Sequence, residues 1–229
     1  TMSREDGWLL EATKILLGRH NLNTAVMLTE FRVGNCKTDV VILNGTSTAY
    51  EIKSERDGLH RLVPQVSTYL SAFAEVNVLA ADSHLDEVLR LSPHQVGVFR
   101  LSARGHLSCI REPIRDTTRL APASIFDAVR MNEAALILQR LGITVPVAPN
   151  TLLHDKLRSI FLELEPSALH AAMVQTLQET RSQINLSQLL AEVPTSLHAA
   201  VLSTRLRRTD HMRLRLALGT SVREAAEWS

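Results

Sequence analysis

The stretch "TDVVILNGTSTAYEIKSERD", from Thr38 to Asp57, decides the fold. A β-branched apolar run headed by Asp39 predicts one strand, and "NGTS" predicts a tight turn after it. A second run that ends in Glu51, Ile52 and Lys53 predicts the returning strand. Because antiparallel neighbours lie about 5 Å apart, this hairpin should bring Asp39 and Glu51 to the same end of the sheet. Glu51 and Lys53 are two residues apart, so they should share one face of their strand.

The rest of the first half mixes helices and strands. Apolar residues at helical spacing predict helices over Arg4–Gly18 and Leu59–Ala74 and a short helix at "SHLDEVLRL". Further strands are predicted at residues 25–33 and 76–81 and at "QVGVFRL" and "HLSCI". The pattern indicates an α/β fold.

The second half changes character at about Pro122, after which only helical patterns occur. Helices are predicted over residues 123–141, 150–162, 167–181, 186–190 and 195–207, and from residue 210 onwards. We therefore predict two domains, residues 1–115 with the sheet and residues 116–229 with helices alone.

Composition excludes several classes of protein. The formal net charge of +1 does not suit a globally basic nucleic-acid coat. No apolar run approaches the roughly 20 residues that a membrane helix needs. Cys36 and Cys109 are far apart in the sequence and form neither a metal-ligand spacing nor a disulfide framework. A cytoplasmic protein without membrane contact is the expectation.

The carboxylates of Asp39 and Glu51 and the ammonium group of Lys53, gathered at one end of a sheet, are the groups that metal-assisted phosphodiester hydrolysis requires. Asp39 and Glu51 would supply hard oxygen ligands for Mg²⁺ or Mn²⁺. The metal would polarise a phosphoryl oxygen and activate water, and Lys53 would hold that water or stabilise developing charge. The alternative is an ordinary salt bridge among three surface side chains.

The stretch resembles the PD-(D/E)XK phosphodiesterase superfamily, which includes restriction endonucleases and RecB-like exonucleases. The motif here is "TD…EIK", with Thr38 where proline often stands. In the following "QVSTY", Gln65 and Tyr69 match the Gln-x-x-x-Tyr element of the RecB-like branch, which lies near the metal and DNA. Alternatively, Tyr69 packs in the core and Gln65 is merely exposed. The segment also resembles a bacterial family of uncharacterised nuclease-like proteins.

This resemblance implies a fold and a set of site residues. The fold would be a restriction-endonuclease-like mixed β-sheet core flanked by helices and followed by an all-α region. The metal ligands would be Asp39, Glu51 and Ile52. An acid upstream of them would be Glu30, with Glu11 as the alternative.

The predicted function is a Mg²⁺-dependent nuclease that acts on DNA rather than RNA. The alternative is a non-catalytic module with the same fold that binds nucleic acid or a protein, including a defence or toxin-type effector. Asp57 and Arg61, four residues apart, are expected to pair, and phosphate contact by Arg56 or Arg61 is the alternative. The helical half could bind substrate, a protein partner or another copy of the chain.

Overall fold

The computed structural model describes residues 4–21, 24–102 and 105–182, together with residues 190, 192–194, 197–198, 201, 210, 212–214 and 216. The helices predicted over residues 186–190, 195–207 and from 210 onwards lie mostly outside the described residues.

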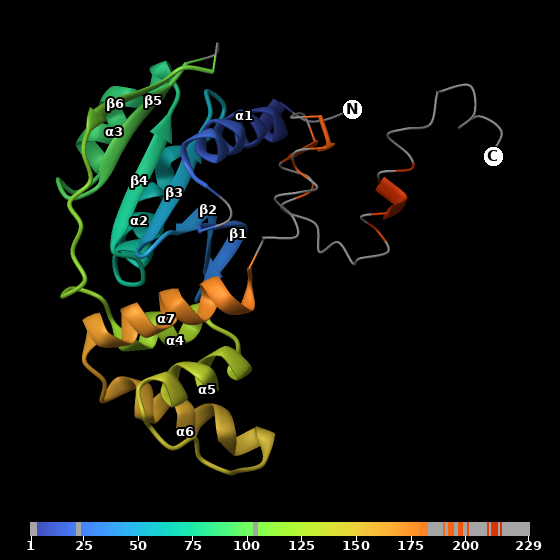
Figure 1. The fold of residues 1–229 in the computed structure, drawn as a ribbon. Coiled ribbons are helices and arrows are strands. Elements are labelled where there is room, and N and C mark those ends of the chain that lie inside the picture. Colours follow the sequence, from blue (N-terminus) through green and yellow to red (C-terminus); the bar gives the residue numbers. More distant parts are fainter. Residues whose placement is uncertain are drawn as a thin grey trace.

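A six-stranded mixed sheet forms the centre of the first half (Figure 1). The strands stand side by side in sequence order: β1 (Val26–Val33), β2 (Cys36–Leu43), β3 (Ser47–Lys53), β4 (Glu75–Ala80), β5 (Gly97–Leu101) and β6 (Leu107–Arg111). The β1–β2, β2–β3 and β5–β6 pairs are antiparallel, whereas β3–β4 and β4–β5 are parallel. The predicted α/β class is thus confirmed, and every predicted strand is present.

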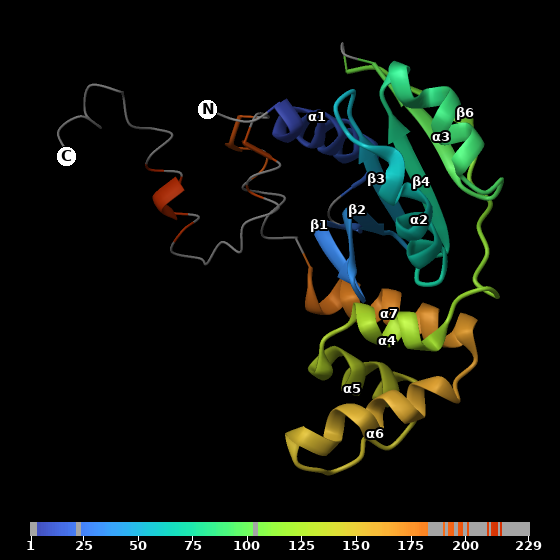
Figure 2. The same ribbon diagram turned by 180° about the vertical axis from the view of Figure 1, so that it is seen from behind.

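Helices cover both faces of this sheet (Figures 1 and 2). On one face lies α1 (Arg4–Arg19). On the other lie α2 (Leu62–Leu70), which follows the 3₁₀ turn η1 (Leu59–Arg61), and α3 (Leu85–Leu91), which follows η2 (Asp82–His84). The parallel β3–β4 and β4–β5 pairs need crossover connections, and α2 and α3 supply them.

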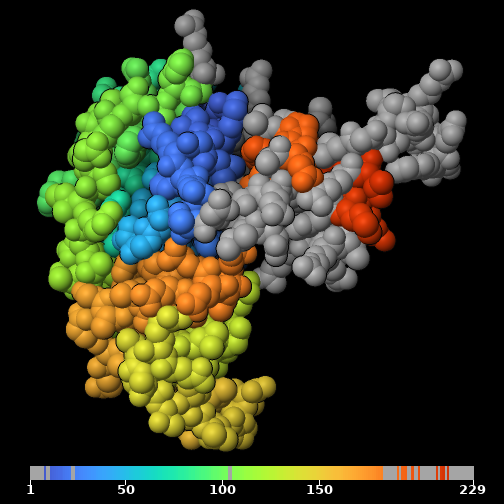
Figure 3. All heavy atoms as spheres, in the orientation of Figure 1, coloured from blue at the N-terminus to red at the C-terminus, as the bar shows by residue number. Residues whose placement is uncertain are grey.

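Up to residue 182, where the continuously described part of the chain ends, the sheet is followed by α4 (Pro122–Ala128), α5 (Met131–Arg140), α6 (Asn150–Leu162) and α7 (Pro166–Thr180). In Figure 3 they form the lower part of the molecule, largely in yellow and orange, and α4 contacts β1 while α7 contacts β2. The single helix predicted over residues 123–141 is wrong, because Val129 and Arg130 are extended and separate α4 from α5. A hydrogen bond of 2.8 Å from the Arg130 N–H to the Glu133 carboxylate stabilises this break, because it caps the start of α5.

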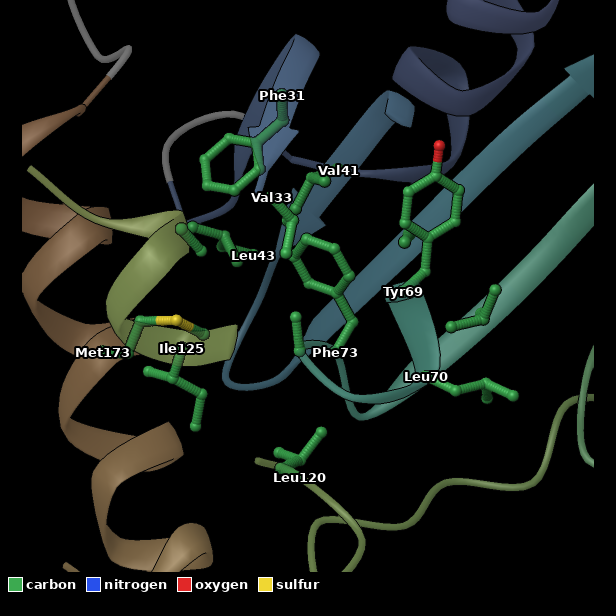
Figure 4. Packing of buried hydrophobic residues seen from close by; sticks show 14 of the residues in the cluster. Phe31, Val33, Val41, Leu43, Tyr69, Leu70, Phe73, Leu120, Ile125 and Met173 are labelled. Carbon is green, nitrogen blue, oxygen red and sulfur yellow. The ribbon is translucent and has the colours of Figure 1, made fainter. Parts of the chain in front are cut away.

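Two hydrophobic clusters hold the sheet and its helices together. The cluster on the α2 face also includes residues of α4, α5, α6 and α7, so it joins both halves of the chain. Figure 4 shows this packing around Phe31 and Phe73, whose rings meet edge to face at 5.9 Å. The opposite cluster packs α1 against Met27, Val40, Ile42 and their neighbours. The domain division at residue 115 stays a prediction.

One residue of β1 breaks the usual alternation of the strand. Val26 and Leu28 pack on the α2 face of the sheet, and so do Phe31 and Val33. Leu28 and Phe31 are three residues apart, and in a regular strand residues an odd number apart would point to opposite faces. Glu30, between them, has a φ of 51°, in the left-handed region. The β1–β2 ladder keeps its register but omits the Glu30–Asp39 pair. This backbone turn is what lets both halves of β1 face the same core.

None of the helices in the described part of the chain combines the length and apolar character that a membrane crossing requires.

Candidate functional site

The side chains of Asp39, Glu51 and Lys53 gather on the face of the sheet that α2 covers. They come from the β2–β3 hairpin, where Val40 pairs with Tyr50 and so places Asp39 beside Glu51. Glu51 and Lys53 are almost fully buried, at 3% and 5% exposure. Gln65 and Tyr69, one turn apart on α2, complete the cluster. We call these five residues the polar cluster.

Glu51 is the centre of the polar cluster, and donors of this chain engage both of its oxygens. Lys53 Nζ lies 2.8 Å from Oε1, and Gln65 Nε2 donates to the same oxygen at 2.7 Å. Gln65 Oε1 in turn accepts from Lys53 Nζ at 3.1 Å. A charge buried this deeply is tolerated only when it is paired and hydrogen-bonded, and these contacts meet that requirement.

Tyr69 closes the other side of the cluster. Its hydroxyl lies 2.9 Å from both Glu51 Oε2 and the Lys37 carbonyl oxygen. Its single hydrogen can serve only one of these acceptors at a time. Burial, and then the charge of Glu51, raise the pKa of the Tyr69 hydroxyl well above its ordinary range. Tyr69 therefore stays protonated and acts as a donor, while its ring packs in the core.

Asp39 is held differently from Glu51. Its Oδ2 accepts a hydrogen bond of 2.7 Å from the main-chain N–H of Ile52. Burial, and then the negative charge of Glu51, raise the pKa of Asp39 from 3.8 to about 7, although the Ile52 N–H and Lys53 act in the opposite direction. Near neutral pH this carboxyl is therefore protonated for part of the time.

The polar cluster fits a divalent metal poorly as it stands. Both oxygens of Glu51 are engaged by donors, and Ile52 reaches Asp39 through its N–H. Within the described residues, no group of three or more His, Cys, Asp and Glu side chains is arranged to hold a metal ion. The expected Mg²⁺ or Mn²⁺ ion stays a prediction.

Glu30 and Glu11, the two candidates for an upstream acid, contact neither Asp39 nor Glu51 in the described part of the chain. Glu30 pairs with Lys37 at 2.7 Å, and its side chain is 58% exposed. Its left-handed backbone accompanies this outward position. Glu11 pairs with Lys14 on α1, at 3.7 Å.

The expected Asp57–Arg61 ion pair is also not formed. Asp57 Oδ2 instead accepts from the N–H and the hydroxyl of Ser54, at 2.7 and 2.6 Å, and so stabilises the turn after β3.

Sequence reasoning missed a second buried polar contact, between Ser47 and His170. Ser47 Oγ lies 2.7 Å from His170 Nε2 and also accepts from the Ala74 N–H. Which of the two atoms donates depends on the imidazole tautomer, because the hydroxyl can donate to Nε2 or accept a second hydrogen bond from it. Burial, and then the charges of Arg115 and Arg119, lower the pKa of His170 from 6.5 to about 4. No local sequence pattern predicts this contact, because Ser47 and His170 are 123 residues apart in the sequence.

Comparisons with known proteins point to a phage family. A family model described as "Bacteriophage P4 protein cII" matches residues 9–199. "Protein cII" of Enterobacteria phage P4 is 30% identical over 129 residues, which are 54% of this chain and 48% of that protein. The chain thus spans about half the length of this curated relative. No solved structure matches the chain.

These matches correct the identification drawn from the sequence. The PD-(D/E)XK assignment is wrong, and so are the predicted Mg²⁺-dependent nuclease and its hydrolase activity, because the matching family is not a nuclease family. A hairpin that gathers Asp39, Glu51 and Lys53 is geometrically sound but not specific, since a buried ion pair produces the same pattern. Because the family model spans the sheet and the following helices, the chain belongs to the bacteriophage P4 protein cII family.

Proposed function

We propose that this chain is a phage regulatory protein that acts by binding a partner rather than by transforming a substrate. Its membership of the phage P4 cII family over residues 9–199 carries the proposal, because the match includes both the sheet and the helices. The restriction-endonuclease-like fold stays a prediction, and a fold by itself would imply no activity.

The polar cluster supports a binding role through rigidity. Its hydrogen bonds tie the end of the β2–β3 hairpin to α2, so the turn between them has a defined position. Ser54 and Asp57 hold that turn from within. A binding loop supported in this way loses little conformational freedom when a partner arrives.

The partner that we propose is nucleic acid, with DNA preferred over RNA. Arg56 lies in the supported turn, and Arg61 lies four residues before Gln65, at the start of α2. Both are exposed, and in the described part of the chain neither has a carboxylate within salt-bridge distance. Guanidinium groups bind phosphate oxygens bidentately. Arg56 and Arg61 are therefore the proposed phosphate contacts.

Fluorescence anisotropy with labelled duplex DNA, single-stranded DNA and RNA at several salt concentrations tests this proposal. We expect the full chain to prefer DNA, and the double variant Arg56→Ala/Arg61→Ala to weaken binding and reduce the salt slope by about 2. Arg90→Ala is the matched control, because Arg90 is an exposed arginine on α3 that pairs with Glu87. Equal binding by the double variant and the parent would contradict the assignment of these arginines.

A neighbouring acid offers an independent check. Glu55 is exposed between Ser54 and Arg56, and its charge opposes an approaching phosphate. We expect Glu55→Gln to tighten DNA binding at low salt, with the gain lost as salt screens the charge. A loss of affinity would indicate that DNA does not approach this turn.

Self-association or a protein partner at the helical half also stays a prediction. Val147 is 99% exposed and Leu152 on α6 is 55% exposed, so apolar side chains are available there. Light scattering coupled to size-exclusion chromatography would measure the mass in solution.

A further inference from the structure

A groove separate from the polar cluster lies beside β1, the first strand in the order of the sheet. It has a volume of about 420 Å³ and is bounded by β1, the α4–α5 connection and the end of α7. Its lining residues are Leu28, Thr29, Glu30, Phe31, Arg32, Asp127, Ala128, Val129, Arg130 and Arg181. This size is within the range of small-ligand sites.

Three arginines from distant parts of the chain line this groove. Arg32 comes from β1, Arg130 from the α4–α5 connection and Arg181 from the residue after α7. Guanidinium groups repel one another, so their convergence is unfavourable unless anions compensate. The fold thus brings together donors suited to an anion.

Arg181 is held in place before any ligand arrives. Its Nε and Nη2 donate to the two oxygens of the buried Glu133 at 2.8 and 2.7 Å. Its guanidinium also lies over the Phe31 ring, 5.1 Å from the centroid. The Glu133 pair does not use Nη1. A donor fixed in this way needs no reordering on binding, which favours affinity.

The described side chains of the groove include slightly more cations than anions. Glu133 pairs with the lining Arg181 and lies 4.0 Å from the lining Arg130, and Lys37 pairs with the lining Glu30. With these two partners included, the described charged side chains are four cations and three anions. The lining carboxylate of Asp127 could accept from a hydroxyl or amine of the same ligand.

The unusual backbone of β1 forms part of the same wall. Glu30, with its φ of 51°, lies in the middle of the β1 segment that lines the groove. Non-glycine residues in the left-handed region are costly and tend to occur at functional positions. This observation is independent of the charges and points to the same place.

We propose that this groove binds a small organic anion through a phosphate or carboxylate group, with Arg32, Arg130 and Arg181 as donors. Its role as an effector site rests on the proposed regulatory function, whereas anion binding itself does not. The site shares no residue with the proposed DNA contacts, so the two proposals can fail separately.

Titration calorimetry of the full chain with inorganic phosphate and with succinate, at constant ionic strength set by chloride, tests the proposal. We expect saturable binding of at least one anion and a loss of about tenfold or more in affinity for Arg32→Gln. Arg158→Gln is the control, because Arg158 lies on α6 and does not line the groove. Phosphate and succinate separate the two anion chemistries.

Three results would overturn the proposal. The first is no saturable heat with either anion, and the second is equal affinity for the parent and Arg32→Gln. The third is that Arg32→Gln loses DNA binding while Arg56→Ala/Arg61→Ala binds DNA as tightly as the parent chain. That result would make the groove a DNA contact. Parental DNA binding by Arg32→Gln together with lost phosphate or succinate binding supports it. Failure of the DNA experiments alone would leave the anion site standing.

Discussion

The main-chain N–H of Ile52 donates a 2.7 Å hydrogen bond to Asp39 Oδ2 across the β2–β3 pair. The Asp39 side chain on β2 is thereby tied to the backbone of β3, although burial and then the negative charge of Glu51 raise its pKa and disfavour its ionisation.

Asp39→Asn should stabilise the protein at high pH. Because burial and the charge of Glu51 raise the pKa of Asp39 from 3.8 to about 7 in the folded chain, its contribution is fully present below pH 3.8, falls as pH rises above 3.8 and is lost once pH passes 7. The loss is on the order of 4 kcal/mol. Asparagine keeps an acceptor for the Ile52 N–H. We expect urea denaturation to show a clearly larger gain in stability at pH 8 than at pH 5, and a uniform effect at both would contradict the assignment.

Lys53→Met should destabilise the protein by about 3–5 kcal/mol, because it leaves the buried Glu51 without its ammonium partner. The double variant Glu51→Gln/Lys53→Met removes both charges and should recover most of that loss. Urea denaturation of the parent, both single variants and the double variant gives the coupling free energy. Additive effects would mean that the two charges do not interact.

Glu30→Gly should be more stable than Glu30→Ala by about 1 kcal/mol. The φ of 51° is strained for a residue with a Cβ but not for glycine. Both variants lose the exposed pair with Lys37, so their difference isolates the backbone. Thermal unfolding measures it. Equal melting temperatures would show that the left-handed conformation carries no strain.

His170 should make the protein sensitive to mild acid. Burial lowers the pKa of His170 from its ordinary 6.5 to about 4 in the folded chain, so the unfolded chain binds the extra proton as pH falls below 6.5. Stability should decline by about 3 kcal/mol between pH 6.5 and 4. His170→Leu should flatten this slope while lowering stability overall, because Ser47 loses its buried hydrogen-bond partner.

The control for His170 is His154→Gln, since the His154 side chain is 55% exposed. It should leave the slope unchanged. A full acid slope in His170→Leu would assign the effect to another group.

Magnesium should bind the polar cluster weakly if at all. The ion would have to displace Lys53 and Gln65 from Glu51 and compete with the proton on Asp39. We expect calorimetry at pH 7.5 to show affinity no tighter than millimolar and to show none for Asp39→Asn. Micromolar binding that depends on Asp39 would mean that the cluster opens readily, contrary to its hydrogen bonds.

Sequence patterns were most reliable where contacts are local. The hairpin "NGTS" and the β-branched runs around it correctly predicted β2 and β3, because a tight turn leaves the flanking residues few other partners. Apolar spacing likewise predicted α6 over its observed bounds. The helical spacing of apolar residues also continued through Val129 and Arg130. There the Glu133 cap starts a new helix, so the chain does not form the single helix that periodicity alone predicts.

The amino-acid sequence by itself determined the described strands, the positions of helices such as α6 and the gathering of Asp39, Glu51 and Lys53, because neighbouring segments set their own geometry. Only the tertiary structure decided that Gln65 and Tyr69 engage Glu51, that Ser47 meets His170, and that Arg32, Arg130 and Arg181 share one groove. Such contacts depend on how whole elements pack. Side chains more than a hundred residues apart meet only after the hydrophobic faces of the sheet and helices have been buried together.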